Sequence, residues 1–170
     1  MSEVPSGLSM PNIERRPPRP TATLMVTRQR ENGVEVLLGN RSESMPSFPG
    51  YWAFPGGGVS RVDTAASESL GISVQHCAIL REVVEELGLA PQAGRLVKVD
   101  NDFRGMVVDD KANWFPLALD GDIPCDTSGM RIISMRTTPP FGPIRFENTF
   151  LHIHADCLLY TSDAADDWSS

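Results

Sequence analysis

The chain has 170 residues, of which 41% are hydrophobic, and this is enough for one domain with its own core. Its formal net charge is −7 and it has no extended basic run, so we do not expect nucleic acid as a partner. No apolar segment is long enough to cross a membrane, the N-terminus lacks the apolar stretch of a signal peptide, and the three cysteines show no metal-binding spacing; we therefore expect a cytoplasmic protein with no membrane partner.

The N-terminal segment 1–20 is polar and rich in proline, which predicts a disordered tail before the folded domain. The domain is predicted to begin with two short apolar runs, 21–27 and 34–38. Asn32-Gly33 lies between them, and this dipeptide is typical of a tight hairpin turn. A β-hairpin is therefore expected at the start of the domain.

A glycine-rich loop and a helix are predicted next. Residues 51–54 form a short strand candidate that leads into the loop 56–58, where three glycines permit close backbone approach and positive φ. The helix begins near Ser73, a suitable N-cap, and Gly88 is a suitable C-cap. Its core-facing stripe is predicted to comprise Val74, Cys77, Ala78, Leu80, Val84 and Leu87.

The end of this helix concentrates three carboxylates on one face. Glu82, Glu85 and Glu86 stand at positions i, i+3 and i+4, where like charges repel one another. A charged amphipathic helix ended by Gly88 would explain the glycine and the aliphatic residues, but it gives no reason for the acidic cluster. Hard divalent cations such as Mg²⁺ and Mn²⁺ prefer oxygen ligands and are often shared with substrate phosphates. The helix is therefore predicted to be half of a metal–phosphate site.

Further strands are predicted at 95–99, 106–108, 114–117, 131–135 and 149–153. Strands, a central helix and then more strands favour an α/β fold with a mixed sheet. His152 and His154 alternate on the last strand and so share one face of it. With no third neutral donor nearby in the sequence, we interpret them as a hydrogen-bonded or exposed pair rather than as metal ligands.

Residues 81–89, Arg-Glu-Val-Val-Glu-Glu-Leu-Gly-Leu, resemble the second half of the Nudix box, and every fixed position matches. Residues 54–58, Phe-Pro-Gly-Gly-Gly, resemble its first half. Seventeen residues, 64–80, then precede Arg81, about ten more than in the usual box. The first acid of the box is represented by Asp63 or by Glu68, and the sequence leaves both open.

The resemblance implies a Nudix-type α/β/α sandwich with a mixed sheet and a hydrolase that cleaves a diphosphate linkage in a nucleoside diphosphate derivative with Mg²⁺ or Mn²⁺. It implies that Glu85 and Glu86 ligate the metal together with the carbonyl of Gly56. Glu82 is implied to be a ligand or the base that deprotonates water, and Arg81 to orient Glu82. A non-catalytic nucleotide-binding Nudix module is the alternative, although the acids of the box are all retained.

Two further segments resemble Nudix hydrolases that act on coenzyme A and acyl-CoA, a small phosphorylated substrate. One comprises Leu37-Leu38, Arg41-Ser42, Gly50 and Phe54 to Gly57, although Pro46 stands where that signature has a later basic residue; the other is 137–150. The resemblance implies substrate contacts by Arg41, Gly57 and Arg145, although Arg145 is equally suited to a structural role. ADP-ribose, nucleotide sugars and nucleoside triphosphates are the alternative substrates.

The C-terminal segment 157–170 resembles a translated sequencing adapter. We therefore expect that the gene product was cut near residue 156 and that its native chain is longer, so that the domain at 21–156 is truncated at its C-terminus and a closing segment or a further domain is missing; a natural polar tail is the alternative. The sequence does not determine the oligomeric state, although homodimers are common among the resembling proteins.

Overall fold

The computed structural model describes residues 17–44, 49–93, 95–140 and 144–154. The expected disordered tail as far as residue 16, Pro46 and the adapter-like segment lie outside the described residues. The elements in chain order are β1 (Arg19–Arg30), β2 (Gly33–Val36), β3 (Gly39–Asn40), β4 (Trp52–Ala53), β5 (Gly56–Gly58), α1 (Arg61–Leu70), α2 (Val74–Leu87), β6 (Leu89–Gln92), β7 (Arg95–Lys98), α3 (Asn101–Asp109), the 3-10 helix η1 (Lys111–Asn113), α4 (Trp114–Asp120), β8 (Arg131–Thr137) and β9 (Phe146–His154).

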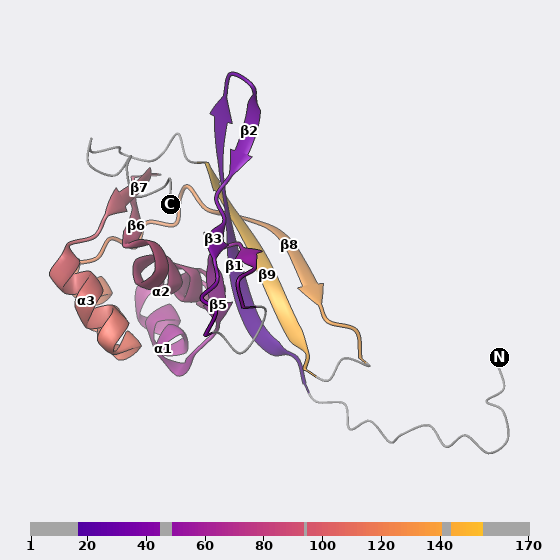
Figure 1. Cartoon of the computed structure of the whole chain (residues 1–170). Coiled ribbons are helices and arrows are strands. Elements are labelled where there is room, and N and C mark those ends of the chain that lie inside the picture. The colour runs from indigo at the N-terminus through magenta and orange to yellow at the C-terminus, as the bar shows by residue number, and fades with distance from the viewer. Residues whose placement is uncertain (1–16, 45–48, 94, 141–143, 155–170) are drawn as a thin grey trace, which may run out of the picture.

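The main sheet has the strand order β2-β1-β9-β8, and β5 also pairs with β1. Strand β1 runs parallel to β9 and antiparallel to β2 and β5, so the sheet is mixed as predicted. The β1–β2 hairpin turns at Glu31-Asn32, with Gly33 as the first residue of β2, and extends beyond the body of the domain (Figure 1). Two small sheets, β3-β4 and β6-β7, complete the strands of the described residues. The expectation of an α/β fold is confirmed.

One face of the sheet carries the core. Alternate residues of β1 and β9 are buried there: Ala22, Leu24, Val26, Thr149, Leu151 and Ile153. The helices of the described residues lie on this side of the sheet, and α2 packs directly against β1 (Figure 1). The alternation of buried and accessible side chains therefore separates a helix-covered face from an open face.

Helix α2 starts and stops where the sequence predicts. The side chain of Ser73 accepts a hydrogen bond from the backbone N–H of His76, and Gly88 ends the helix with a φ of 64°. Its buried surface is wider than the predicted stripe, because Ile79 and Val83 are also fully buried. The physical reason is that α2 contacts α1 and α3 as well as the sheet. Helix α2 is therefore the centre of the core.

The strands predicted at 106–108 and 114–117 are wrong, because these residues belong to α3 and α4. Short apolar runs do not distinguish a strand from one turn of a buried helix. Here Asp100 caps the first turn of α3, and Asp110 caps η1, which leads into α4. The two helices bury Val107 and Trp114 in the core.

The extra residues of the box form a helix of their own. Helix α1 lies between the glycine-rich loop and α2, and it packs against α2. Its first turn contains Asp63, whose carboxylate accepts a 2.7 Å hydrogen bond from the backbone N–H of Ser60. The insertion therefore adds a packed element next to the acidic end of α2.

Candidate functional site

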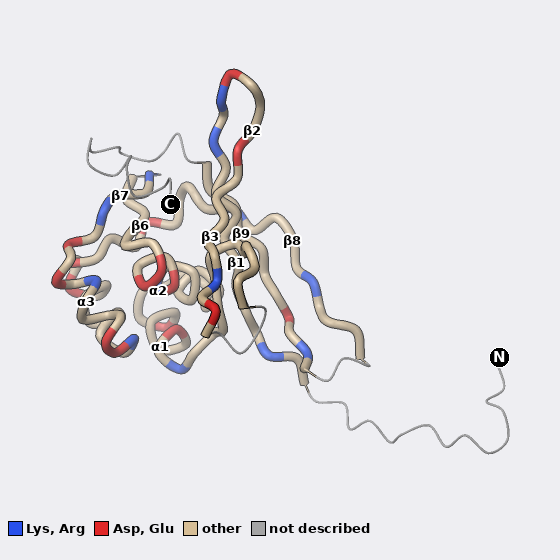
Figure 2. The backbone as a smooth tube through the Cα atoms, viewed as in Figure 1, with Lys and Arg blue, Asp and Glu red and all other residues tan. Residues whose placement is uncertain are grey.

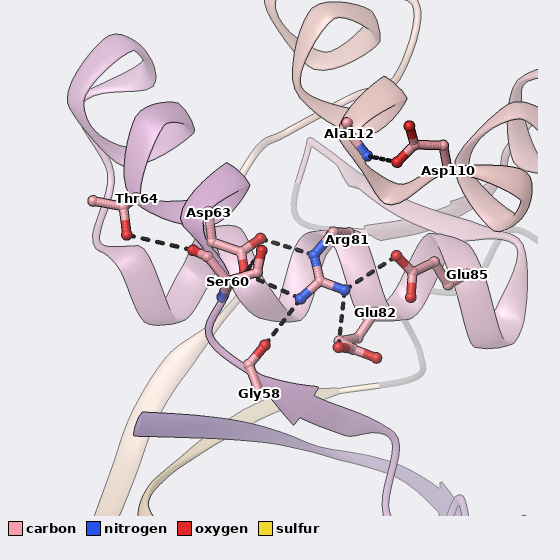
Figure 3. Close-up of polar contacts among 9 residues, drawn as sticks. All are labelled: Gly58, Ser60, Asp63, Thr64, Arg81, Glu82, Glu85, Asp110 and Ala112. Atoms are coloured by element: carbon pink, nitrogen blue, oxygen red, sulfur yellow. Dashed lines mark hydrogen bonds and ion pairs between the residues drawn. The ribbon is translucent and has the colours of Figure 1, made fainter. Parts of the chain in front are cut away.

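Arg81 lies at the centre of the acidic cluster and is only 2% exposed (Figure 3). Its Nε and Nη2 atoms donate to the two carboxylate oxygens of Asp63 at 2.8 and 3.0 Å. Its Nη1 atom donates to Glu82 at 2.9 Å and to Glu85 at 3.1 Å. Nη2 also donates to the carbonyl oxygen of Gly58 at 3.1 Å. One planar guanidinium therefore ties α1, α2 and the glycine-rich loop together.

The structure distinguishes the two candidates for the first acid of the box. Asp63 is fully buried and forms the bidentate pair with Arg81, whereas Glu68 is exposed on α1. The shorter side chain reaches Arg81 because α1 brings its own first turn against α2. Asp63, and not Glu68, therefore occupies the position that faces the arginine.

The glycine-rich loop predicted at 56–58 is in fact the short strand β5, which pairs with β1 and fits tightly over the glutamates. A Cβ atom on Gly57 would lie 2.2 Å from Oε1 of Glu82. Gly56 has a φ of 149°, and a Cβ atom there would lie 2.3 Å from the carbonyl oxygen of Ala22. The backbone N–H of Gly56 donates to the carboxylate of Glu86 at 3.1 Å. A side chain is thus excluded at Gly56, where backbone atoms are in the way, whereas at Gly57 it would displace the Glu82 carboxylate; the loop backbone reaches the acidic cluster directly.

The cluster holds more negative charge than Arg81 compensates. Burial raises the pKa of Glu86 to about 7; the Gly56 N–H opposes this shift, and the charges of Glu82 and Glu85 add to it. Burial also raises the pKa of Glu82, against the lowering effect of the adjacent Arg81. Neighbouring carboxyl groups with raised pKa values resist ionisation. A bound cation would stabilise their charged form.

The donor set fits a hard divalent cation by its chemistry. Glu82, Glu85 and Glu86 offer oxygen atoms on one face of α2, and the closely packed Gly57 leaves room for Glu82. In the arrangement described, Glu82 and Glu85 face Arg81. Across the described ranges no three acidic, histidine or cysteine side chains are grouped as metal ligands. The residues are thus of the type that Mg²⁺ or Mn²⁺ prefers, while Glu82 and Glu85 are turned toward Arg81 rather than toward a shared metal position.

Arg104 on α3 supports the same helix end, and the sequence analysis did not identify it. Its Nη2 atom donates to the carbonyl oxygens of Glu85 and Glu86, each at 3.3 Å. These carbonyls belong to the last turn of α2, where the backbone C=O groups have no hydrogen-bond donors within the helix. A Cβ atom on Gly88 would lie 3.0 Å from Cδ of Arg104, so this glycine also makes room for the guanidinium. The sequence does not indicate this arginine, because it predicts a strand at 106–108 where the structure has the helix α3.

A cleft of about 650 Å³ opens beside the glycine-rich loop, on the open face of the sheet. Gly56 and Gly57 line it and also contact the glutamates, so the loop is shared by the cleft and the acidic cluster. Arg41 lines the cleft, as its predicted role requires. Arg145 does not line it; its Nε atom donates to the carbonyl oxygen of Thr138 at 3.4 Å. Arg136 lines the cleft and was not identified from the sequence.

The histidine pair on β9 lies away from the acidic cluster. Nε2 of His152 is 2.8 Å from the hydroxyl of Thr27, and the two imidazole rings of His152 and His154 meet edge to face at 6.5 Å. They share one face of the strand, as predicted, and they belong to no group of metal ligands among the described residues. Within the same residues, no helix is long and apolar enough to cross a membrane.

Comparison with known proteins agrees with this geometry. A family model described as the NUDIX domain matches residues 17–123. A NUDIX hydrolase from Alicyclobacillus acidocaldarius has a similar fold, with a TM-score of 0.67 and 24% identity over 84% of this chain and 72% of that one. A MutT/nudix family protein from Enterococcus faecalis is 17% identical with a TM-score of 0.48, and the match covers 86% of this chain but 39% of that one. No curated protein sequence matches significantly. The matched family model spans the glycine-rich loop, α1 and α2, and the chain belongs to the Nudix hydrolase family.

Proposed function

We propose that this protein is a divalent-metal-dependent hydrolase that cleaves the diphosphate linkage of coenzyme A or an acyl-CoA. The observation that carries the proposal is the arrangement of Arg81, Glu82, Glu85 and Glu86 under a glycine-rich loop that also lines a cleft. This places oxygen donors and a substrate-sized opening on two sides of the same backbone segment.

The chemistry of each residue follows from its surroundings. Glu85 and Glu86, with the Gly56 carbonyl, would hold the cation, and a bound cation would neutralise charge on the diphosphate. Arg81 is buried among three carboxylates and acts as the residue that positions Glu82 and Glu85. Glu82 has a raised pKa, and a carboxylate that is less easily ionised is a stronger proton acceptor. We assign to it the proton of the attacking water.

The preference for coenzyme A rests on the sequence resemblance and on Arg41. This arginine lines the cleft near Gly56, and its charge lowers the pKa of Glu86, which shows that it lies within electrostatic range of the cluster. Phe54, Phe146 and Phe150 also line the cleft and offer aromatic surface for a nucleobase. ADP-ribose, nucleotide sugars and nucleoside triphosphates would be served by the same cluster and form the comparison set.

The test is hydrolysis of coenzyme A, acyl-CoA and the comparison set with Mg²⁺ or Mn²⁺, with the products separated by chromatography. We expect Glu85→Gln to lower the rate roughly a hundredfold or more, the scale of losing a group that acts on transition-state charge. Glu68→Gln, on an exposed position of α1, is the matched control and should leave the rate unchanged. Unfolding of each variant by urea shows whether the fold is retained.

An unchanged rate in Glu85→Gln would contradict the assignment of α2 as the catalytic helix. Metal-dependent nucleotide binding without hydrolysis by the folded protein would instead support a binding module. Cleavage of another member of the set, with coenzyme A untouched, would keep the hydrolase and replace its substrate.

A further inference from the structure

A row of residues crosses the open face of the sheet from the glycine-rich loop to β8. The strand register places Gly58 opposite Thr21, Thr21 opposite Asn148, and Asn148 opposite Arg136. The neighbours of Asn148 in β9 alternate with it, and Thr149 and Leu151 are buried on the helix-covered side. Asn148 and its register partner Arg136 therefore project on the open face, where both line the cleft.

The middle of this row is a rigid polar floor. Nδ2 of Asn148 donates to the hydroxyl of Thr23 at 3.0 Å, and its Oδ1 atom accepts from the hydroxyl of Thr21 at 3.0 Å. These side chains hold one another, and they form a polar path between Gly56 and Arg136. A substrate anchored at Gly56 and Gly57 would extend along this path toward Arg136.

Two arginines line the cleft. They are Arg41 and Arg136, and among the described residues no aspartate or glutamate lines it. In a chain with a formal net charge of −7, a cleft with this composition favours an anionic ligand. Strand β8 carries Arg131 and Arg136 and no acidic residue, in contrast to the acidic helices on the other side (Figure 2).

The distance between strands separates Arg136 from the glycine-rich loop. Neighbouring strands are about 4.8 Å apart, so the three steps from Gly58 to Arg136 span about 14 Å between backbones. Arg136 is exposed, and its Nη1 atom donates to the carbonyl oxygen of Met135 at 3.2 Å, which keeps the guanidinium beside its own strand. The guanidinium then lies several ångströms beyond a diphosphate held at the loop. It would meet a different part of the substrate, not the scissile group.

We infer that Arg136 binds a second phosphate group, a monoester on the ribose of the nucleoside diphosphate derivative. The inference rests on the proposed function and deepens it, because it separates substrates that carry this phosphate from those that lack it. The hydroxyl of Thr137, which also lines the cleft, is next to Arg136 in the chain and can contribute a further donor. Arg136 is thus a specificity-determining residue at the far end of the cleft.

The kinetic test uses substrate pairs that differ by one phosphate: coenzyme A with 3′-dephospho-coenzyme A, and ADP-ribose 2′-phosphate with ADP-ribose. We expect the native protein to prefer the member of one pair that carries the phosphate. Arg136→Ala should lower kcat/KM for that member by about tenfold or more, mainly through KM, and should leave its dephosphorylated partner within about twofold. Arg136→Lys should restore part of the preference, because the charge is kept.

Arg131→Ala is the matched control, since Arg131 lies on the same strand, is also exposed and does not line the cleft. An equal loss for both members of a pair, or an equal effect of Arg131→Ala, would overturn the inference while the hydrolase proposal stands.

A binding experiment tests the inference without any need for substrate turnover. Calorimetry compares adenosine 3′,5′-bisphosphate and adenosine 2′,5′-bisphosphate with AMP, without added metal. Tighter binding of either bisphosphate that is lost in Arg136→Ala supports the second anion site even if every substrate resists hydrolysis, in which case the proposed function fails alone. Equal binding of all three nucleotides by the native protein would overturn the inference.

Discussion

A single buried guanidinium organises the candidate site at the scale of residues. Arg81 meets the carboxylates of Asp63, Glu82 and Glu85, so three formal negative charges share one positive charge. Glu86 adds a fourth carboxylate that relies on the N–H of Gly56. Such an excess of negative charge costs free energy in the absence of a cation, and the pKa of Glu86 is raised by desolvation and by the charges of Glu82 and Glu85.

The raised pKa of Glu86 predicts how stability depends on pH without divalent cations. The pKa rises from 4.5 to about 7 on folding, so between these values the folded protein binds more protons than the unfolded chain. The free energy of unfolding should therefore fall as pH rises from 4.5 to 7 and then level off. Urea unfolding in EDTA at pH 5 and pH 8 measures this fall. In Glu86→Gln the fall should be smaller, and an identical fall in both proteins would contradict the prediction.

At the scale of elements, the inserted helix α1 is joined to α2 by a buried ion pair. Asp63 lies in the first turn of α1 and makes two hydrogen bonds to Arg81, while it also accepts from the backbone of Ser60. The extra residues of the box are therefore not a peripheral loop. They carry the acid that fixes Arg81 on α2.

We expect Asp63→Asn to lower the free energy of unfolding by about 3 kcal/mol, because it leaves the buried Arg81 with an amide in place of a carboxylate. Glu68→Gln on the same helix should change it by less than about 0.5 kcal/mol, because Glu68 is exposed. Chemical denaturation of the two variants beside the native protein measures both values. A comparable loss in Glu68→Gln would contradict the distinction between the two acids.

At the scale of the whole molecule, the helices cover only part of one sheet face. Ile132 of β8 and Leu151 of β9 are register partners and project on the same side. Leu151 is fully buried, whereas Ile132 is 52% exposed. The difference arises because β8 is the edge strand of the sheet and extends beyond the helices (Figure 1).

Because the helices cover β9 but not β8, two similar substitutions should lower the free energy of unfolding by different amounts. Leu151→Ala should lower the free energy of unfolding by about 2–5 kcal/mol, because it opens a cavity in the core. Ile132→Ala should cost less than about 1 kcal/mol, because its side chain is already half in solvent. Thermal and urea unfolding of the two variants compare them directly. Equal losses would show that β8 is covered in solution.

Local chemistry in the sequence predicted the features that depend on neighbours along the chain. Asn32-Gly33 predicted the hairpin, and Ser73 and Gly88 predicted the limits of α2. The spacing of Glu82, Glu85 and Glu86 predicted one acidic helix face. Hydrogen bonds and side-chain spacing within a few residues decide each of these features, so the sequence contains the whole cause.

Contacts between distant segments decided the rest. The choice of Asp63 over Glu68 depends on how α1 packs against α2, and the helical state of 106–108 and 114–117 depends on capping and burial rather than on apolar content. Arg136 lines the cleft because the register of β8 with β9 places it opposite Asn148, whereas Arg145 precedes β9 and donates to the carbonyl oxygen of Thr138. The sequence alone was sufficient to predict the acidic face of α2 and the Nudix family. Only the tertiary structure decided which partners that helix meets, because those partners come from segments far away in the chain.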